Sequence, residues 1–295
     1  MDPAITLAHL SDLHLRRGFP ERWEAANEAL ALQEVRSADL VVVTGDVTES
    51  GLTNELEMAE ELFDDVARQG RLLVVPGNHD ASLHGLNAGT IVNRLTGVRR
   101  MVSDAFADVS VVGGSARRIG SRGSPWPVRR LLAGGRCAVY GLDSTRASLG
   151  DLLARGCCGE SQLDALDEDL DALEPGTRVV FVLHHHVTSH PGGRGAFDTD
   201  PALELLDKRQ VQALLRRYRV ELVLHGHRHR FWHRCFRDAQ VIGGASTTLG
   251  CHRLGERFVV LATLQLDSGV VTARLRYLDR REDVVEDVLL RCPER

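Results

Sequence analysis

The 295-residue sequence lacks long hydrophobic runs, cysteine pairs with metal-site spacing and, with one exception, lysine. No segment approaches the roughly 18 consecutive apolar residues that a membrane-spanning helix needs. Residues 1–4 have neither the basic region nor the apolar core of a secretory signal. These absences exclude a membrane span and predict a soluble, cytoplasmic protein. The hydrophobic content of 43% is enough for a single large domain over residues 1–295.

The cysteine pattern excludes a conventional structural zinc site, because no two cysteines have CxxC spacing. Two of them, Cys157 and Cys158, are adjacent, which is a poor arrangement for sharing a zinc ion. In a cytosolic chain we expect the cysteines to stay reduced. The set is Cys137, Cys157, Cys158, Cys235, Cys251 and Cys292.

The near absence of lysine leaves arginine as the basic residue, since Lys208 is the only lysine among 36 Lys and Arg. The net charge of −5 and the pI of about 6.2 argue against a general binder of polyanions. Nine arginines and only two acidic residues occur between 94 and 136. This stretch predicts either a groove that neutralises nucleic-acid phosphates or a solvated cap that pairs with the acidic segment near 164–171. The cap is favoured because Phe106 and Trp126 are the only aromatic residues available for base stacking.

Short apolar runs alternate with amphipathic segments along much of the chain, which predicts an α/β fold with parallel strands. Buried strands are expected at Ile5–Leu10, Leu40–Val43, Leu72–Val75, Cys137–Leu142, Val179–Leu183 and Val220–Leu224. Helical spacing is found at Glu21–Val35, Asn54–Gln69, Ser161–Leu173 and Asp207–Tyr218. Residues 258–278 predict a C-terminal β-hairpin, whereas residues 85–136 show no regular pattern.

Five of these strands are followed directly by side chains that bind metal ions. The fragments are Asp12-Leu13-His14, Gly45-Asp46, Gly77-Asn78-His79-Asp80, His184-His185-His186 and His225-Gly226-His227-Arg228-His229. Because ligand sites in open α/β sheets gather beyond the carboxyl ends of strands, we expect the five fragments to converge. In extended segments, the first and third residues of Asp-x-His and His-x-His would face the same side. Each preceding glycine would let the backbone turn sharply off its strand.

The ordered set D-x-H, G-D, G-N-H-D, H-H-H and G-H-x-H, from Asp12 to His229, resembles the calcineurin-like metallophosphoesterase superfamily. The triple histidine is most similar to the class III cyclic nucleotide phosphodiesterase branch. The resemblance implies a four-layer α/β/β/α sandwich with a dimetal site at the carboxyl ends of the strands. It also implies that residues 85–136 contribute to substrate specificity.

The resemblance further implies a role for individual side chains. Ligands of the first ion would be Asp12, His14 and His229, those of the second Asn78, His184 and His227, and Asp46 would bridge the two ions. His79 would contact the scissile phosphate or protonate the leaving group, and Asp80 would orient His79. Asn78 and His79 would also bind substrate. Arg16 and His186 are further candidates for contact with the phosphate, with a solvated or packed side chain as the alternative for each.

The ligand chemistry, oxygen and imidazole without thiolate, suits two divalent ions, Mn or Fe first and Zn or Ni as alternatives. Such a pair can hold a bridging water, lower its pKa and generate a hydroxide that attacks phosphorus. We therefore predict a metal-dependent phosphodiesterase that acts on a cyclic nucleotide or another small diester, as a monomer or homodimer. A DNA or RNA nuclease, a phosphomonoesterase and a non-catalytic scaffold of the same fold are the alternatives. The scaffold is least favoured because no ligand is missing from the pattern.

Overall fold

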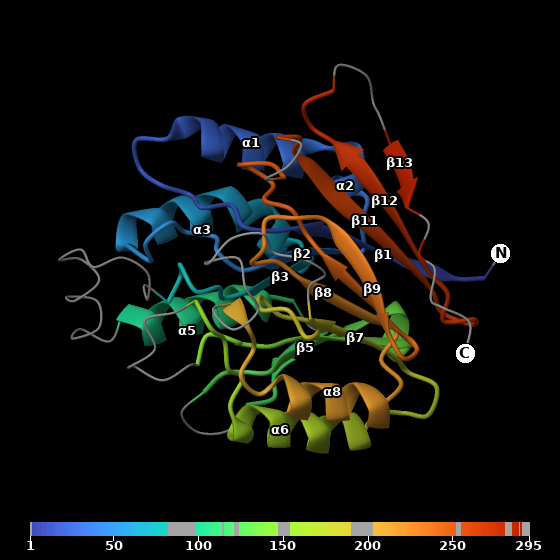
Figure 1. Ribbon diagram of the computed structural model, residues 1–295. Helices are drawn as coiled ribbons and strands as arrows, with labels where there is room; N and C mark the ends of the chain where they lie inside the picture. The colour runs from blue at the N-terminus through green and yellow to red at the C-terminus, as the bar shows by residue number, and fades with distance from the viewer. Residues whose placement is uncertain are drawn as a thin grey trace.

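Two β-sheets lie face to face between two layers of helices, in a four-layer α/β/β/α sandwich (Figure 1). This computed structural model describes residues 2–81, 98–113, 115–120, 124–146, 154–189, 203–251, 255–280, 285–288 and 290, with side chains omitted at 98–101. The four layers are those expected from the sequence.

The first sheet has the strand order β13-β12-β11-β1-β2-β3. Its strands are β1 (Ala4–Leu10), β2 (Leu40–Thr44), β3 (Leu72–Val75), β11 (Phe258–Gln265), β12 (Val271–Tyr277) and β13 (Val285–Val288). Strands β1, β2 and β3 are parallel. The C-terminal hairpin of β11 and β12 lies antiparallel beside β1. The hairpin predicted at 258–278 is thus an integral part of this sheet.

The second sheet has the strand order β4-β5-β6-β7-β8-β10-β9. Its strands are β4 (Ala116–Arg118), β5 (Val128–Leu132), β6 (Cys137–Gly141), β7 (Arg178–Val182), β8 (Leu222–His225), β9 (Trp232–Phe236) and β10 (Ala239–Gly243). The central strands β6, β7, β8 and β10 are parallel. Their carboxyl ends therefore lie along one edge, as do those of β1, β2 and β3 in the first sheet.

Helices cover the outer faces of both sheets and flank the edge of the first. They are α1 (Pro20–Ala31), α2 (Gln33–Arg36), α3 (Thr53–Arg68), α5 (Val98–Ser110), α6 (Glu160–Asp171) and α8 (Lys208–Arg217). A short 3-10 turn, η1 (Ala133–Gly135), joins β5 to β6. Figure 1 shows α6 and α8 side by side below the second sheet, with α1 and α3 on the opposite side of the molecule.

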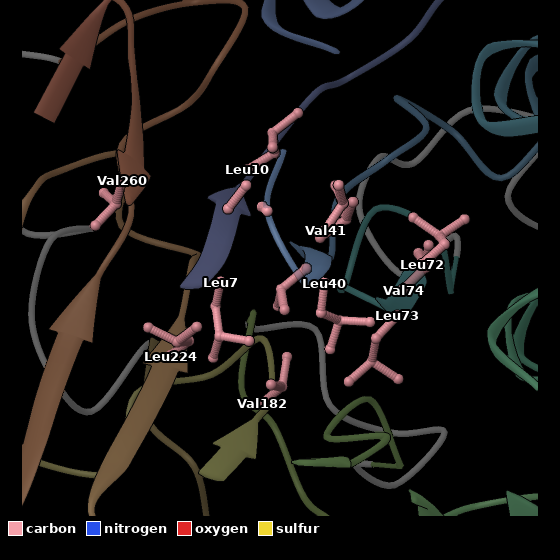
Figure 2. Close-up of a cluster of buried hydrophobic side chains, with 14 of the residues drawn as sticks. Leu7, Leu10, Leu40, Val41, Leu72, Leu73, Val74, Val182, Leu224 and Val260 are labelled. Carbon is pink, nitrogen blue, oxygen red and sulfur yellow. The ribbon is translucent and has the colours of Figure 1, made fainter. Parts of the chain in front are cut away.

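The main hydrophobic core fills the space between the two sheets. Figure 2 shows Leu7 of β1 close to Val182 of β7 and Leu224 of β8, with Leu40 and Leu73 beside them. All five side chains are completely buried. Burial of a leucine or valine side chain contributes roughly 1.5–3 kcal/mol. This packing fixes the two sheets relative to one another, and with them their strand ends.

The structure departs from the predicted elements in several places. The strands β9, β10 and β13 were not predicted. The helix expected over Glu21–Val35 is two helices, because Leu32 takes an extended conformation (φ −55°, ψ 137°) between α1 and α2. The segment 85–136 is not irregular in its described part, since it contains α5, β4 and β5. The strand β5 was not predicted because its sequence, VRRLL, contains two arginines, which usually face water. In the structure these arginines are paired or buried.

The arginine-rich stretch forms pairs within the protein. Arg117 and Arg129 both bond to the carboxylate of Asp169 on α6. Arg118 pairs with Asp108 of α5. These contacts agree with a cap that meets the acidic helix. They do not support an open basic groove for nucleic acid in the described residues.

One cysteine departs from expectation. Cys235 is disulfide-bonded, so the prediction that all six cysteines stay reduced is wrong. Cys137, Cys157, Cys158 and Cys251 are free. Among the described helices, none has the length and apolar character needed to cross a membrane.

Arg130 of β5 closes the open edge of the first sheet. Its side chain is fully buried. Its guanidinium donates from Nε to the carbonyl of Leu72 (2.9 Å), from Nη1 to that of Gly70 (2.6 Å) and from Nη2 to that of Val112 (2.7 Å). The Oγ of Ser110 accepts from the N–H of Val74 and donates to its carbonyl. Side chains thus replace the strand that would otherwise pair with β3.

Replacement of Arg130 by methionine should destabilise the fold, because the buried carbonyl of Leu72 and the more accessible carbonyls of Gly70 and Val112 lose their donor. At about 1–3 kcal/mol for a buried unsatisfied group, and less for the two that water can reach, we expect a loss of about 3 kcal/mol in the free energy of unfolding. Urea denaturation followed by circular dichroism measures this loss. The matched control is Arg274→Met, at an exposed position on β12. Equal midpoints for the two variants would contradict the prediction.

Candidate metal centre

The carboxyl ends of strands from both sheets meet at one place. Hydrogen bonds join the two sheets there, among them two through candidate ligands. The ring Nδ1 of His184, after β7, donates to the carbonyl of Thr44 on β2 (2.7 Å). The backbone N–H of His227, after β8, donates to Oδ1 of Asp12, after β1 (3.1 Å). The convergence of strand ends expected from the sequence is therefore present, and it is enclosed by protein.

The first group of donor atoms comes from Asp12, His14, His229 and Asp46. The Nε2 atoms of His14 and His229 lie 2.9 Å apart, and His229 Nε2 is 3.4 Å from Asp12 Oδ1. Asp46 Oδ2 lies 4.0 Å from His14 Nε2. These are the residues assigned to the first ion together with the expected bridge.

The second group is centred on His184. Its Nε2 lies 2.9 Å from Oδ1 of Asn78 and 3.1 Å from Nδ1 of His227. The same nitrogen is 3.4 Å from Asp46 Oδ2. The three residues assigned to the second ion are therefore together, and the same oxygen of Asp46 faces both groups.

The orientation of Asp46 explains why one oxygen can serve both groups. Its Oδ1 accepts the backbone N–H of His79 at 2.8 Å, which leaves Oδ2 directed between His14 and His184. Asp46 is almost completely buried. This geometry is the one a bridging carboxylate needs.

The donor set fits a pair of divalent cations. Adjacent ligand atoms at about 2.1 Å from an ion are about 3.0–3.4 Å apart, close to most of the separations observed. Burial lowers the pKa of His14 to about 4 and that of His227 well below its usual value, so both rings can offer lone pairs. Burial disfavours the charged carboxylate of Asp46, but His184 and His79 outweigh it and hold its pKa well below the usual range.

His184 shows the need for a cation most directly. Burial disfavours its charged form, yet Asp46 and Asp12 raise its pKa to about 9. The carboxylates of Asp46 and Asp12 thus favour positive charge at His184. Divalent ions would supply that charge when bound, and their binding would displace a proton from the ring.

The backbone of the site is left-handed at five ligands, a conformation that non-glycine residues rarely adopt. The φ values are 51° at Asp12, 48° at His14, 48° at Asp46, 75° at His227 and 47° at His229. The expectation of extended Asp-x-His and His-x-His segments is therefore wrong, because tight turns aim the side chains. Strain of this kind gathers at functional sites and costs about 1–3 kcal/mol for each residue.

The three glycines that precede ligands have different roles. Gly45 has a φ of 83° and makes the turn that the sequence predicts. Gly77 and Gly226 have no positive φ, so a left-handed conformation is not what requires glycine there. A Cβ on Gly77 would lie 2.2 Å from the backbone nitrogen of Asp46, and one on Gly226 would lie 2.1 Å from Oγ of Ser11. Close approach of two chain segments excludes a side chain at both positions.

His79 lies beside the first group, and 27% of its side chain is exposed. Its ring centroid is 4.7 Å from that of His14. Its Nδ1 lies 2.9 Å from the carbonyl oxygen of Glu49. Because a carbonyl only accepts, Nδ1 carries the proton in this bond. Glu49 was missed in the sequence, where a backbone acceptor leaves no signature beyond its place three residues after Asp46.

Asp80 does not orient His79 by direct contact, contrary to what the resemblance implied. Its buried carboxylate accepts the backbone N–H groups of Val47, Thr48 and Gly77, and the hydroxyl of Thr48. Burial and the nearby Asp46 raise its pKa to about 6. Asp80 therefore holds the loop that follows Asp46.

The other two histidines of the triplet are buried. His185 lies with His184 and His227 in a group that could hold a metal ion. Its two ring nitrogens are engaged by protein, since it accepts from the hydroxyl of Ser144 (2.8 Å) and donates to the carbonyl of Ala154 (3.2 Å). The His186 ring stacks 6.4 Å from that of His227. Complete burial of His186 does not support the direct contact with substrate that the sequence suggested.

Arg16 is the candidate substrate residue at the surface of the site. It is exposed, and its guanidinium carbon lies 5.1 Å from the centre of the Phe19 ring. This position, two residues after His14, leaves Arg16 free to reach a bound anion.

Gly77→Ala should abolish tight metal binding, because the new methyl group would displace the backbone and carboxylate of Asp46. Metal content after reloading with Mn, measured by mass spectrometry, provides the readout. Gly134→Ala is the control, since it places a methyl group in open space at a φ of 66° and tests backbone strain alone. Retention of two ions by Gly77→Ala would show that this close approach is not required.

Several solved structures have the same fold, with TM-scores above 0.5. A dimetal phosphatase from Danio rerio has a TM-score of 0.58 and 16% identity, over 97% of this chain and 99% of that one. The purple acid phosphatase PPD1 from yellow lupin has a TM-score of 0.57 and 11% identity, over 97% and 53%. GAP50, the anchor in the inner membrane complex of Plasmodium, has a TM-score of 0.55 and 11% identity, over 98% and 90%. At these identities the likeness concerns the fold.

A comparison with curated protein sequences finds no match. The sequence model of the calcineurin-like phosphoesterase family, however, matches residues 5–231. That range contains all five fragments of candidate metal ligands, three of the six strands of the first sheet and five of the seven strands of the second. The chain therefore belongs to the calcineurin-like phosphoesterase family.

Proposed function

We propose that this protein is a metal-dependent phosphodiesterase that hydrolyses a small diester, such as a cyclic nucleotide. The observation that carries the proposal is the meeting of two groups of donor atoms at Oδ2 of Asp46, with His79 partly exposed beside them. Family membership supports metal-dependent hydrolysis of phosphate esters. The finer choice of a diester rests on the triple histidine after β7.

Oxygen and imidazole donors without thiolate favour Mn or Fe, with Zn or Ni as alternatives. Two such ions, when bound, supply a nucleophile derived from water at neutral pH and neutralise charge on the phosphoryl oxygens. The protein provides Asp12 and Asp46 as anionic ligands and keeps His14 and His227 neutral.

His79 is proposed to act on the leaving group. The Glu49 carbonyl holds the proton on Nδ1, so a second proton at Nε2 can be donated to the departing oxygen. Asn78 and the exposed Arg16 complete the proposed contacts with the phosphate. Arg16 adds the positive charge that the anionic substrate requires.

The alternatives are weaker on specific observations. A nuclease needs unpaired basic side chains along its groove, whereas Arg117, Arg118 and Arg129 pair with carboxylates. The net charge of −5 points the same way. A scaffold would have no reason to keep candidate metal ligands in a strained backbone conformation. The fold itself does not separate a scaffold from an enzyme, because one structure of similar fold is described as an anchor.

The reaction class can be tested with metal-free protein reloaded with Mn. We expect hydrolysis of bis(p-nitrophenyl) phosphate with a higher kcat/KM than hydrolysis of p-nitrophenyl phosphate. Asn78→Ala, which removes a proposed ligand, should lose activity on both substrates. Preference for the monoester would replace the proposal with a phosphomonoesterase of the same site.

His79→Ala should lower kcat by roughly 100-fold or more, with two ions still bound, if His79 is the general acid. The loss should be larger for an alkoxide leaving group, as in a cyclic nucleotide, than for p-nitrophenolate, which departs without a proton. His233→Ala, on β9 and bonded to Gln240, is the control. Equal losses for both leaving groups would rule out proton donation by His79.

A further inference from the structure

A chain of buried hydrogen bonds leads from the strands of the first sheet to the candidate metal centre. Nε2 of His9 lies 2.8 Å from Oγ1 of Thr44. Thr44 donates to Oγ of Ser11 at 2.7 Å, and Ser11 donates to Oδ2 of Asp12. All four side chains are at most 2% exposed. The chain connects the cores of β1 and β2 to one oxygen of a proposed metal ligand.

The direction of the chain follows from its charged end. The Asp12 carboxylate is anionic and only accepts, so the Ser11 hydroxyl must donate to it and accept from Thr44. The Thr44 hydroxyl has then used its proton and must accept from His9. Nε2 of His9 therefore carries a proton. Burial lowers the pKa of His9 to about 4, so at neutral pH this is the single proton of a neutral ring.

His9 itself is an unfavourable residue for this position. Its Nδ1 is buried without a hydrogen-bond partner in the described part of the chain. An unsatisfied buried nitrogen costs about 1–3 kcal/mol, whereas an apolar side chain in the same core would avoid that cost. The advantage of histidine at this position is its hydrogen-bond donor at Nε2.

We propose that His9, Thr44 and Ser11 are positioning residues that fix the Asp12 carboxylate for the ion shared with His14 and His229. Oδ2 is tied to Ser11, which turns Oδ1 toward His229 Nε2, 3.4 Å away. Asp12 then presents one oxygen in a fixed direction. The inference rests on the proposed function, because it assigns these residues to its metal centre.

Thr44 offers a way to separate this role from general packing. Its backbone carbonyl accepts from Nδ1 of His184, a ligand of the second ion, while its hydroxyl serves Asp12 of the first. Thr44→Val removes the hydroxyl, keeps the carbonyl and has nearly the same shape. The first ion should therefore be affected and the second should not.

The experiment is calorimetric titration of Mn²⁺ into metal-free protein, with anomalous diffraction of Mn-soaked crystals to assign each ion. We expect Thr44→Val to bind the ion of Asp12, His14 and His229 about tenfold more weakly, as is common when a partner of a metal ligand is lost. The affinity for the other ion should be unchanged. Thr263→Val, at a part-buried threonine of β11 in the same sheet, should behave like the wild type.

A second pair of variants tests the far end of the chain and keeps the test valid if Thr44→Val does not fold. His9→Gln retains an N–H donor near the position of Nε2, whereas His9→Leu removes it. His9→Gln should restore most of the affinity that His9→Leu loses. This rescue distinguishes a donor from a side chain that merely fills space.

Two results would overturn the inference while leaving the proposed function intact. The first is wild-type affinity for both ions in Thr44→Val and His9→Leu. The second is equal weakening of both ions, which would indicate general loosening of the core. Absence of Mn²⁺ binding to the wild type would instead reject the proposed function, and the inference with it.

Discussion

Negative charge enclosed between two sheets is the constraint on which the rest of the site depends. Asp12 and Asp46 are buried, anionic and directed at the same small space. An unpaired buried charge is too costly to persist, so the surrounding chain must supply compensation. It does so with backbone N–H groups, with the hydroxyl of Ser11 and with a proton on His184. Divalent ions are the compensation that this arrangement suits best.

Holding these carboxylates in place has a structural cost that the fold carries elsewhere. Five ligands adopt left-handed backbone, and two glycines allow chain segments to touch. The apolar core between the sheets supplies the free energy that offsets this strain. Asp80 adds a local contribution by binding three backbone N–H groups around the loop after Asp46. The packed layers thus provide most of the stability, whereas the backbone strain lies at the edge where the strands of both sheets end.

Much of this could be predicted from the sequence, for a physical reason. A buried parallel strand is a short apolar run, and a polar residue at its end must lie at the edge of the sheet, so Asp12, Asp46, Asn78 and His184 could be placed together. The contact of His79 with the backbone carbonyl of Glu49 could not be predicted, because every residue carries a backbone carbonyl. The strand β5 was missed because Arg130 looks like a surface residue until its three acceptors are known. The orientation of Asp80 depends on loop geometry that spacing alone does not fix.

The division of each ligand group between the two sheets has a mechanical meaning. Asp12 and His14 follow a strand of the first sheet, whereas His229 follows the second, and Asn78 and His184 are divided in the same way. An ion bound there is a cross-link between the two halves of the sandwich. Sliding of one sheet across the other would pull its ligands apart, so occupancy of the site and alignment of the sheets are coupled quantities. The resistance of this protein to unfolding would then rise and fall with the supply of metal around it.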